Sequence, residues 1–267
     1  LYTELKVLEI THVADLHNVL RSKIIGLFFK ISGTPVDKIN KGRAEKKALT
    51  RTKNKIFKQL KSSHQRYADV FGKLGFPVNI SQPKSVEKQK LLNQIIKITG
   101  EKNKPWIGIA PFAAFKSKTY PLDLLTKVID QLSKKGYQLF LFGGESDSLI
   151  LNPLAEKFNN VINVAGKLGG IKNELNLISN LNVMLSMDSG NAHFSAMLGV
   201  KTITLWGGTH PFAGFSPYNQ PTDYCLLPDL EKYPNLPCSV YGNKVCEGYE
   251  DVMRSIPPQK IVDKITI

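Results

Sequence analysis

Residues 181–217 read LNVMLSMDSGNAHFSAMLGVKTITLWGGTHPFAGFSP, and the interpretation of the chain starts from this stretch. Two apolar runs, residues 183–187 and 200–206, are typical of buried strands. Between them, residues 191–198 have the composition of a helix that ends at Gly199. A strand, a helix and a second strand in this order predict neighbouring parallel strands.

Polar and small residues follow both predicted strands. Asp188, Ser189 and Gly190 follow the first, and residues 207–209 follow the second. In a parallel sheet these ends meet at one edge, where ligands bind. The helix start adds unpaired N–H groups and a positive dipole end, which suit a phosphate. We expect His193 to join this ligand site; the alternatives are turn glycines and a core histidine bonded to a carbonyl.

Positive charge is concentrated in the first part of the chain. Residues 1–98 hold 20 Lys and Arg against 7 Asp and Glu, a net charge of +13, whereas the remaining residues contribute +1. A basic half of this kind predicts an anionic partner, which could be a nucleic acid, an acidic membrane surface or a phosphorylated or carboxylated substrate. The alternative is an ordinary solvated face.

Composition indicates a globular protein with room for two compact domains or one large one. No window approaches the roughly 18 apolar residues of a membrane span, and the first residues lack a signal-peptide pattern, so we expect a cytoplasmic protein. The three cysteines are an odd number, which argues against a secreted disulfide scaffold. Reduced thiols are expected, although Cys238 and Cys246 could pair or hold a metal.

The N-terminal part predicts a strand at residues 10–16, a helix at 19–31 and a strand at 36–39. Asp15, His17 and Arg21 would lie at the carboxyl end of the first strand and face a cleft. For Asp15, capping of the following helix is an equally good interpretation.

Residues 41–51, KGRAEKKALTR, are interpreted as a dense basic loop, and residues 56–74 as an amphipathic helix. The basic loop holds few aromatic residues, and nucleic-acid grooves usually interleave aromatics for base stacking. A Lys and Arg cluster beside a cleft is better suited to phosphates or carboxylates on an acceptor molecule.

The remaining chain alternates strands and helices, which predicts an α/β fold with a parallel, doubly wound sheet. The expected strands are residues 106–110, 137–142, 161–164, 183–187 and 200–206, and the expected helices are residues 86–99, 121–132, 146–158, 174–181 and 191–198. We place domains at 1–98 and 99–245. Residues 246–267 form a tail whose helix, 259–265, could pack back on the first domain.

Strands in this second half end in residues that suit a nucleotide. Glycines allow close approach to the backbone, lysines neutralise phosphate, and a carboxylate can accept hydrogen bonds from ribose hydroxyls. Neither G-x-G-x-x-G nor G-x-x-x-x-G-K-[ST] is present, so a standard dinucleotide or P-loop site is not expected. The strand-end residues are Gly108 and Lys118, Gly143 to Glu145, Gly166 and Lys167, Asp188 to Gly190, and Gly207 and Gly208.

Five segments, residues 111–121, 142–145, 163–167, 188–193 and 207–211, resemble the bacterial heptosyltransferases of lipopolysaccharide core synthesis in order and spacing. The resemblance covers residues 105–217 well and extends more weakly through Cys238 and Cys246. It implies an inverting glycosyltransferase with two facing Rossmann-like domains of the B type. An ADP-heptose donor would bind the C-terminal domain, and an anionic lipid-linked acceptor the N-terminal domain.

The resemblance also assigns roles to individual residues, without a metal or a cofactor. Donor binding falls to Lys118 at the phosphates, Glu145 at the ribose, Gly166 near the adenine, Asp188 at the heptose hydroxyls, and Ser189, Gly190 and His193 at the diphosphate. Acceptor binding falls on the basic side, at Arg21, Arg43, Lys46 and Lys47. Such an acceptor would place the enzyme peripherally on the inner membrane surface, and no nucleic-acid partner is expected.

The chain departs from the family pattern at the catalytic base. The family carries an Asp in a Gly-rich turn after the first strand of the N-terminal domain, and no such turn precedes residue 10. We therefore expect the base upstream of Leu1 and an incomplete N-terminal domain, with Asp15 as the substitute within this chain. The competing hypotheses are an epimerase-like enzyme acting on a nucleotide sugar, and a non-catalytic module that binds nucleic acid or anionic lipid.

Overall fold

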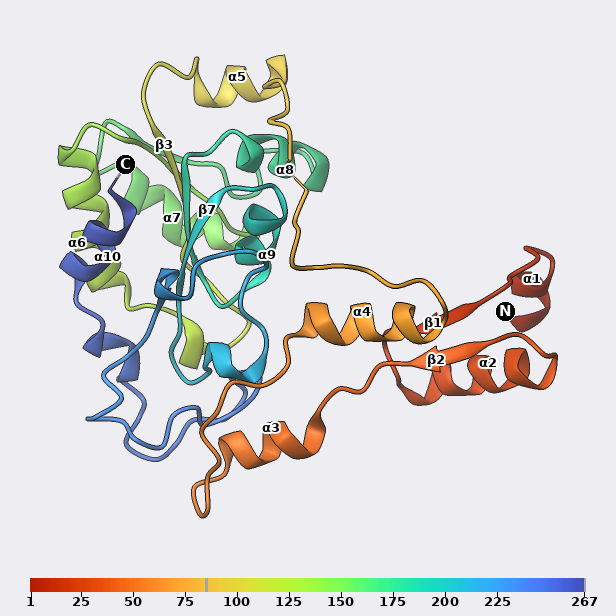
Figure 1. Ribbon diagram of the computed structural model, residues 1–267. Helices are drawn as coiled ribbons and strands as arrows, with labels where there is room; N and C mark the ends of the chain where they lie inside the picture. Colours follow the sequence, from red (N-terminus) through yellow and green to blue (C-terminus); the bar gives the residue numbers. More distant parts are fainter. Residues whose placement is uncertain (85, 267) are drawn as a thin grey trace.

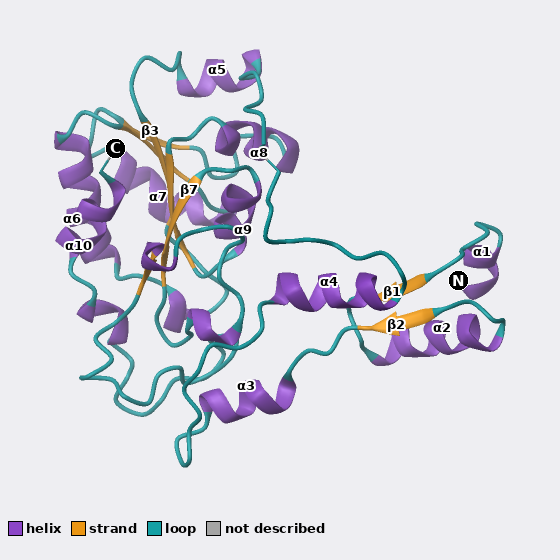
Figure 2. Ribbon diagram, in the orientation of Figure 1, coloured by secondary structure: helices purple, strands orange, loops and turns teal. Residues whose placement is uncertain are grey.

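The computed structural model describes residues 1–84 and 86–266, which form two parallel sheets with helices around them (Figure 1). A two-stranded sheet lies with the N-terminus at one end of the molecule, and a six-stranded sheet occupies the other end (Figure 2). The predicted α/β class with parallel strands is confirmed.

The larger sheet is doubly wound. Its strand order is β5-β4-β3-β6-β7-β8, and every neighbouring pair is parallel. The chain therefore moves outward in one direction from β3 and in the other from β6, and these two strands meet with Ala110 opposite Ser186. The strands are β3 (Trp106–Ala110), β4 (Gln138–Leu141), β5 (Val161–Asn163), β6 (Val183–Met187), β7 (Lys201–Leu205) and β8 (Cys225–Leu226).

Helices cover both faces of this sheet, which is why its central strands are fully buried. One face packs against α6 (Leu122–Lys134), α7 (Ser148–Ala155) and α10 (Pro258–Ile265). The other packs against α5 (Asn93–Thr99), α8 (Ile171–Ser179) and α9 (Gly190–Met197). In α6 the buried residues recur at helical spacing, as an amphipathic helix requires.

The C-terminal tail packs on the larger sheet layer and not on the N-terminal elements, which corrects our expectation. Helix α10 contacts α6 extensively, and its buried Ile261, Val262 and Ile265 belong to the same core as α6. Just before α10, the Arg254 guanidinium donates to both carboxylate oxygens of Asp123 on α6, at 2.9 and 2.6 Å.

The N-terminal half is built on β1 (Val13–Asp15) and β2 (Val36–Lys38), joined by α2 (Leu20–Ile31) and preceded by α1 (Tyr2–Lys6). The strands are parallel, with Val13 opposite Val36. The strand–helix–strand unit is therefore as predicted, although the first strand is shorter than residues 10–16.

The basic stretch predicted as a loop is a helix, α3 (Arg43–Thr50). Gly42 precedes it in the left-handed conformation at φ 61°, and Lys46 and Leu49 are buried one helical turn apart. This spacing buries one face and leaves the charges of Arg43 and Lys47 in solvent. The neighbouring prediction of a helix over 56–74 was too long, because α4 spans Ser63–Lys73.

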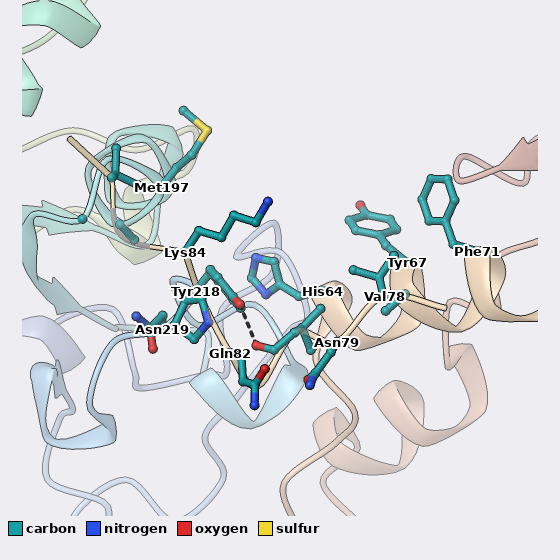
Figure 3. Close-up of a pocket in the computed structure, with 16 residues that line it drawn as sticks. His64, Tyr67, Phe71, Val78, Asn79, Gln82, Lys84, Met197, Tyr218 and Asn219 are labelled. Atoms are coloured by element: carbon teal, nitrogen blue, oxygen red, sulfur yellow. Dashed lines mark hydrogen bonds between the residues drawn. The ribbon is translucent and has the colours of Figure 1, made fainter. Parts of the chain in front are cut away.

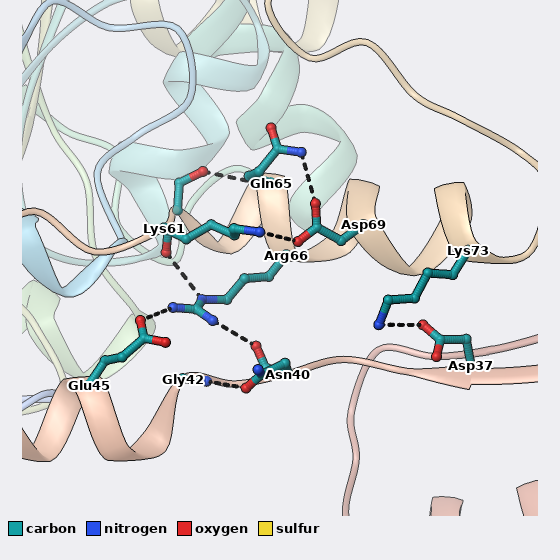
Figure 4. Close-up of polar contacts among 10 residues, drawn as sticks. Asp37, Asn40, Gly42, Glu45, Lys61, Gln65, Arg66, Asp69 and Lys73 are labelled. Atoms are coloured by element: carbon teal, nitrogen blue, oxygen red, sulfur yellow. Dashed lines mark hydrogen bonds and ion pairs between the residues drawn. The ribbon is translucent and has the colours of Figure 1, made fainter.

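Arg66 of α4 ties this part of the chain together (Figure 4). Its buried guanidinium donates to the carbonyls of Lys61 and Asn40 at 3.1 and 3.0 Å and to the carboxylate of Glu45 at 3.0 Å. A side chain at Gly42 would collide with the guanidinium, since an added Cβ would lie 2.4 Å from it. Arg66 thus links α3, α4 and the chain that follows β2.

The two halves join through backbone contacts. The N–H of Leu60 donates to the carbonyl of Phe212 at 2.9 Å, and that of Ser63 donates to Gly214 at 2.8 Å. These bonds commit the backbone on either side of Ser62, which is extended, to the other half of the molecule, and α4 therefore begins only at Ser63. Because α5 packs in the core of the larger sheet, we propose that the domain boundary lies before α5 and not after residue 98.

Short 3₁₀ helices occupy several of the connections around the larger sheet. They are η1 (Lys116–Lys118), η2 (Glu145–Asp147), η3 (Pro211–Ala213), η4 (Thr222–Tyr224) and η5 (Val252–Ser255). None of the helices in residues 1–84 and 86–266 is long and apolar enough to cross a membrane.

Candidate functional site

The candidate site lies at the carboxyl ends of β3, β6 and β7, where the strand order of the larger sheet reverses. Lys118, in the loop after β3, places its Nζ 3.3 Å from Oδ2 of Asp188, which follows β6. The Thr209 hydroxyl, after β7, donates to the same Oδ2 at 2.9 Å. The two strand ends therefore meet as expected, since Asp188 contacts both Lys118 and Thr209, the last of the polar residues 207–209.

His193 lies in the first turn of α9, within electrostatic range of this pair. Burial lowers its pKa, Lys118 acts in the same direction, and Asp188 opposes them. The lowered pKa favours a neutral imidazole at pH 7, which offers one N–H donor and one acceptor.

His64 on α4 belongs to the same region and was missed by sequence reasoning. Burial lowers its pKa, and the proximity of His193 lowers it further. His64 thus brings the N-terminal half within range of the α9 start. No local motif surrounds His64 in the sequence, so only the docking of the two halves reveals it.

Ser189 and Gly190 lie beside a cavity of about 450 Å³ at the point where β3 and β6 diverge. Ser189 is the residue that precedes α9, and its hydroxyl is 3.1 Å from that of Ser186. The first N–H groups of α9 have no intrahelical partners. Together with the dipole of α9, they make this cavity suitable for a phosphate.

The Gly-rich turn after β4, residues 143–145, lines the same cavity through its two glycines. The Asp147 carboxylate accepts a hydrogen bond from the N–H of Gly144 at 2.8 Å and holds the turn. Gly166, after β5, lies directly against Glu145: it has φ 71°, and an added Cβ would lie 2.9 Å from the Glu145 Cα. Glu145 and Gly166 both line a second cavity of about 250 Å³. The structure thus places these two predicted residues together.

The loop between Cys238 and Cys246, which a disulfide closes, packs against the Lys118 side chain. Cys238 and Cys246 are bonded, with a Cα–Cα distance of 5.3 Å, which corrects the expectation of reduced thiols for this pair, whereas Cys225 is free. Within the loop, the Gly242 carbonyl accepts from the Ser117 hydroxyl at 2.6 Å. An added Cβ at Gly242 would lie 2.7 Å from Cγ of Lys118.

The predicted acceptor residues are not equivalent. Arg21, Arg43 and Lys47 are exposed, whereas Lys46 is buried. The Lys46 ammonium lies 4.1 Å from the centre of the Phe215 ring, a cation–π contact between the two halves. Burial lowers the pKa of Lys46 to about 8, assisted by Arg66 and opposed by Glu45. Lys46 therefore contributes to the contact between the two halves, whereas the other three residues face solvent.

Asp15 is a capping residue in this structure. Its carboxylate accepts from the N–H groups of His17 and Asn18 at 3.0 and 2.6 Å and from the Ser22 hydroxyl at 2.8 Å. Burial acts to raise the pKa of Asp15, but these hydrogen bonds and the nearby His17 together outweigh it and lower the pKa. These contacts favour the structural alternative that the sequence left open.

A third cavity, of about 760 Å³, lies between α4, residues 78–84 with Val86, and the C-terminal end of α9 (Figure 3). His64 and Tyr67 of α4 line it, opposite Met197 of α9. The Tyr218 hydroxyl donates to the Ile80 carbonyl at 2.6 Å, and both residues line this cavity.

In the part of the chain that the structure describes, no group of three or more His, Cys, Asp and Glu side chains is arranged to hold a metal ion.

Comparison with known families gives a match over residues 2–243 to glycosyltransferase family 9 (heptosyltransferase). The chain belongs to glycosyltransferase family 9. This confirms the resemblance drawn from the five sequence segments, and extends it into the N-terminal half.

Among curated relatives of this family 9 chain, lipooligosaccharide heptosyltransferase 2 of Haemophilus ducreyi is 32% identical over 184 residues, covering 63% of this chain and 49% of the relative. The protein with the same description from Haemophilus influenzae is 29% identical over 140 residues, covering 50% of this chain and 40% of the relative. The chain thus matches half or less of the length of these relatives.

Solved structures show the same fold. The E. coli ADP-heptose LPS heptosyltransferase II has a TM-score of 0.63 at 18% identity, covering 99% of this chain and 78% of that chain. A family 9 glycosyltransferase from Veillonella parvula has a TM-score of 0.67 at 17% identity, covering 98% and 75%. The family 9 chain therefore follows the architecture of these enzymes, and the arrangement of two parallel-sheet units is confirmed.

Proposed function

We propose that this family 9 chain transfers a heptose or similar sugar, with inversion, from an ADP-sugar to an anionic acceptor of the lipopolysaccharide core. The observation that carries the proposal is the convergence of Lys118, Asp188 and His193 at the start of α9, beside the cavity at the strand switch point. This arrangement supplies a cation, helix N–H groups and an imidazole for a diphosphate, and a carboxylate for sugar hydroxyls.

In the proposed reaction, the acceptor hydroxyl attacks the anomeric carbon of the donor sugar, and the bond from that carbon to the diphosphate oxygen breaks. Negative charge develops on the departing diphosphate. Lys118 and the N–H groups of α9 are preorganised to stabilise this charge, because they are already in place before the bond breaks. Asp188 holds the Lys118 ammonium through Oδ2, and we propose that its other carboxylate oxygen accepts hydrogen bonds from the sugar hydroxyls.

The acceptor hydroxyl must lose its proton to a general base as it attacks. Asp15 is poorly suited to this role, since three donors already occupy its carboxylate. The N-terminal half suits an anionic acceptor because residues 1–98 carry a net charge of +13. We propose that Arg21, Arg43 and Lys47, which are exposed, attract the acceptor and that it binds from the inner surface of the membrane.

The proposal is tested by incubating the protein with ADP-heptose and a Kdo- and phosphate-bearing lipid acceptor and following both ADP release and a heptose-bearing lipid. We expect both products to form together, and no altered sugar nucleotide from the donor alone. Conversion of the donor without an acceptor would favour an epimerase-like activity. Failure of both reactions, with the donor and the acceptor shown to be competent for a known heptosyltransferase, would contradict the proposal.

A further inference from the structure

The two smaller cavities of the candidate site are parts of one trough. The cavity of about 450 Å³ and that of about 250 Å³ share four lining residues, which are Phe142, Gly143, Gly144 and Glu174. At one end of the trough lie Ser189 and Gly190 at the start of α9. The other end is lined by the glycines and apolar residues that follow β5, residues 164–171.

Glu174 is the acidic residue where the two cavities meet. It belongs to α8, is half-buried, and its burial raises the pKa of its carboxyl. Its backbone N–H bonds to the Gly170 carbonyl at 3.2 Å, but within residues 1–84 and 86–266 its carboxylate has no hydrogen-bond or ion-pair partner. The sugar transfer proposed above assigns no role to this side chain.

Two nearby aspartates have partners, and Glu145, which also lines the trough, is exposed to solvent. Asp147 accepts from the Gly144 N–H at 2.8 Å, and Asp188 is held by Lys118 and Thr209. A carboxylate that is withdrawn from water without a partner costs free energy, so a partner is expected from elsewhere. The contrast with Asp147 indicates that Glu174 is not needed to hold the Gly-rich turn.

We infer that Glu174 binds the nucleoside part of the donor and hydrogen-bonds to an N–H or O–H group of the base or ribose. This inference rests on the proposed function and extends it, because it assigns Glu174 a place between the start of α9 at one end of the trough and Gly166 at the other. A diphosphate at Ser189 and Gly190 directs the attached nucleoside along the trough toward Gly166, and the nucleoside must then pass Glu174. The raised pKa has the same physical origin, since burial withdraws this carboxyl from water and a polar group of the nucleoside would supply the missing partner.

The test compares Glu174→Leu, which removes the polar group, with Glu174→Gln, which keeps its size and one acceptor. Glu156→Leu on the exposed end of α7 is the matched control. Titration calorimetry measures the affinity for ADP and, separately, for inorganic pyrophosphate. We expect Glu174→Leu to weaken ADP binding at least tenfold, Glu174→Gln to weaken it less, and all variants to bind pyrophosphate within twofold of the unmodified protein.

Two analogues then locate the group that Glu174 binds. 2′-Deoxy-ADP lacks one ribose hydroxyl, and purine riboside 5′-diphosphate lacks the amino group of the base. The analogue without the partner group should bind the unmodified protein and Glu174→Leu with equal affinity. If the unmodified protein binds ADP and both Glu174 variants bind it within twofold of the same affinity, the inference is overturned while the proposed function stands. If the unmodified protein binds no ADP, both are overturned.

Discussion

The ammonium of Lys118 and the carboxylate of Asp188 lie 3.3 Å apart although 70 residues separate them in the chain. Their side chains are 12% and 11% exposed. Lys118 arrives from the loop after β3 and Asp188 from the end of β6, so the pair closes the site across the strand switch point. Because the pair is nearly buried, each side chain limits the rotamers of the other. The ion pair therefore fixes the orientation of both groups in the site.

Thr209 should contribute to this pair through its hydrogen bond to Asp188. Thr209→Val removes the hydroxyl and keeps the side-chain shape, and we expect it to lower the free energy of unfolding by about 1 kcal/mol. Thr209→Ser keeps the hydroxyl and serves as the control. Urea unfolding at pH 7 measures both, and equal stabilities for the two variants would show that the hydroxyl contributes nothing.

Gly242 should matter for nucleotide binding because its backbone lies against the Lys118 side chain. Gly242→Ala would place a Cβ 2.7 Å from Lys118 Cγ, at a left-handed φ of 88°. Gly248→Ala is the matched control, since φ is 75° there and no atom lies within 4 Å of the added Cβ. Both variants should lose similar stability from backbone strain. Only Gly242→Ala should weaken ADP binding, by about tenfold, equivalent to about 1.4 kcal/mol. Equal ADP affinities of the two variants would show that the contact between Gly242 and Lys118 does not affect nucleotide binding.

The Cys238–Cys246 bond should stabilise the loop that carries Gly242. Closing a short loop restricts the unfolded chain, and removal of the bond is expected to cost about 2–3 kcal/mol. Adding a reductant should therefore lower the melting temperature of the unmodified protein. The Cys238→Ser and Cys246→Ser double variant should melt at this lower temperature with or without the reductant. An unmodified protein that melts at one temperature in both conditions would argue against a stabilising bond.

His210 predicts a pH dependence of stability. Burial lowers its pKa to about 4, with Lys55 acting in the same direction, whereas the unfolded value is about 6.5. Between these pH values the unfolded chain binds more protons, so stability falls as pH decreases, by up to roughly 3 kcal/mol at pH 4. Above pH 6.5 this dependence fades, and it is nearly absent by about pH 7.5.

The control for this pH effect is His210→Asn, whose side-chain oxygen can still accept from the Phe212 N–H that now donates to Nδ1 of His210. Urea unfolding at pH 7 and pH 4.5 should show a smaller loss of stability for this variant than for the unmodified protein. The same loss in both proteins would assign the pH dependence to other groups.

Local sequence patterns predicted the larger sheet well, because its strands are short apolar runs buried on both faces. β3 and β6 occupy the predicted residues, 106–110 and 183–187. The polar residues that follow such strands must meet at one edge of a parallel sheet, so the proximity of Lys118 and Asp188 followed from topology alone.

The errors arose where distant contacts decide the structure. Residues 56–62 have a helical pattern but form no helix, since the N–H groups of Leu60 and Ser63 bond to the carbonyls of Phe212 and Gly214. The basic stretch 41–51 contains α3 and is not a loop, because Lys46 and Leu49 lie one helical turn apart and are buried on one face of the helix. His64, Glu174 and the disulfide lie outside any local motif, and only the assembled structure shows where they lie relative to the site.

The most direct test of the account is the affinity for ADP of Lys118→Met, compared with that of the unmodified protein and of Lys116→Met. Lys116 lies two residues away in η1 and is exposed, so its substitution controls for net charge. By titration calorimetry we predict tight binding to the unmodified protein and to Lys116→Met, and at least a 30-fold loss for Lys118→Met. Equal losses for the two variants, or no binding of ADP to the unmodified protein, would contradict a diphosphate site at Lys118 and the start of α9.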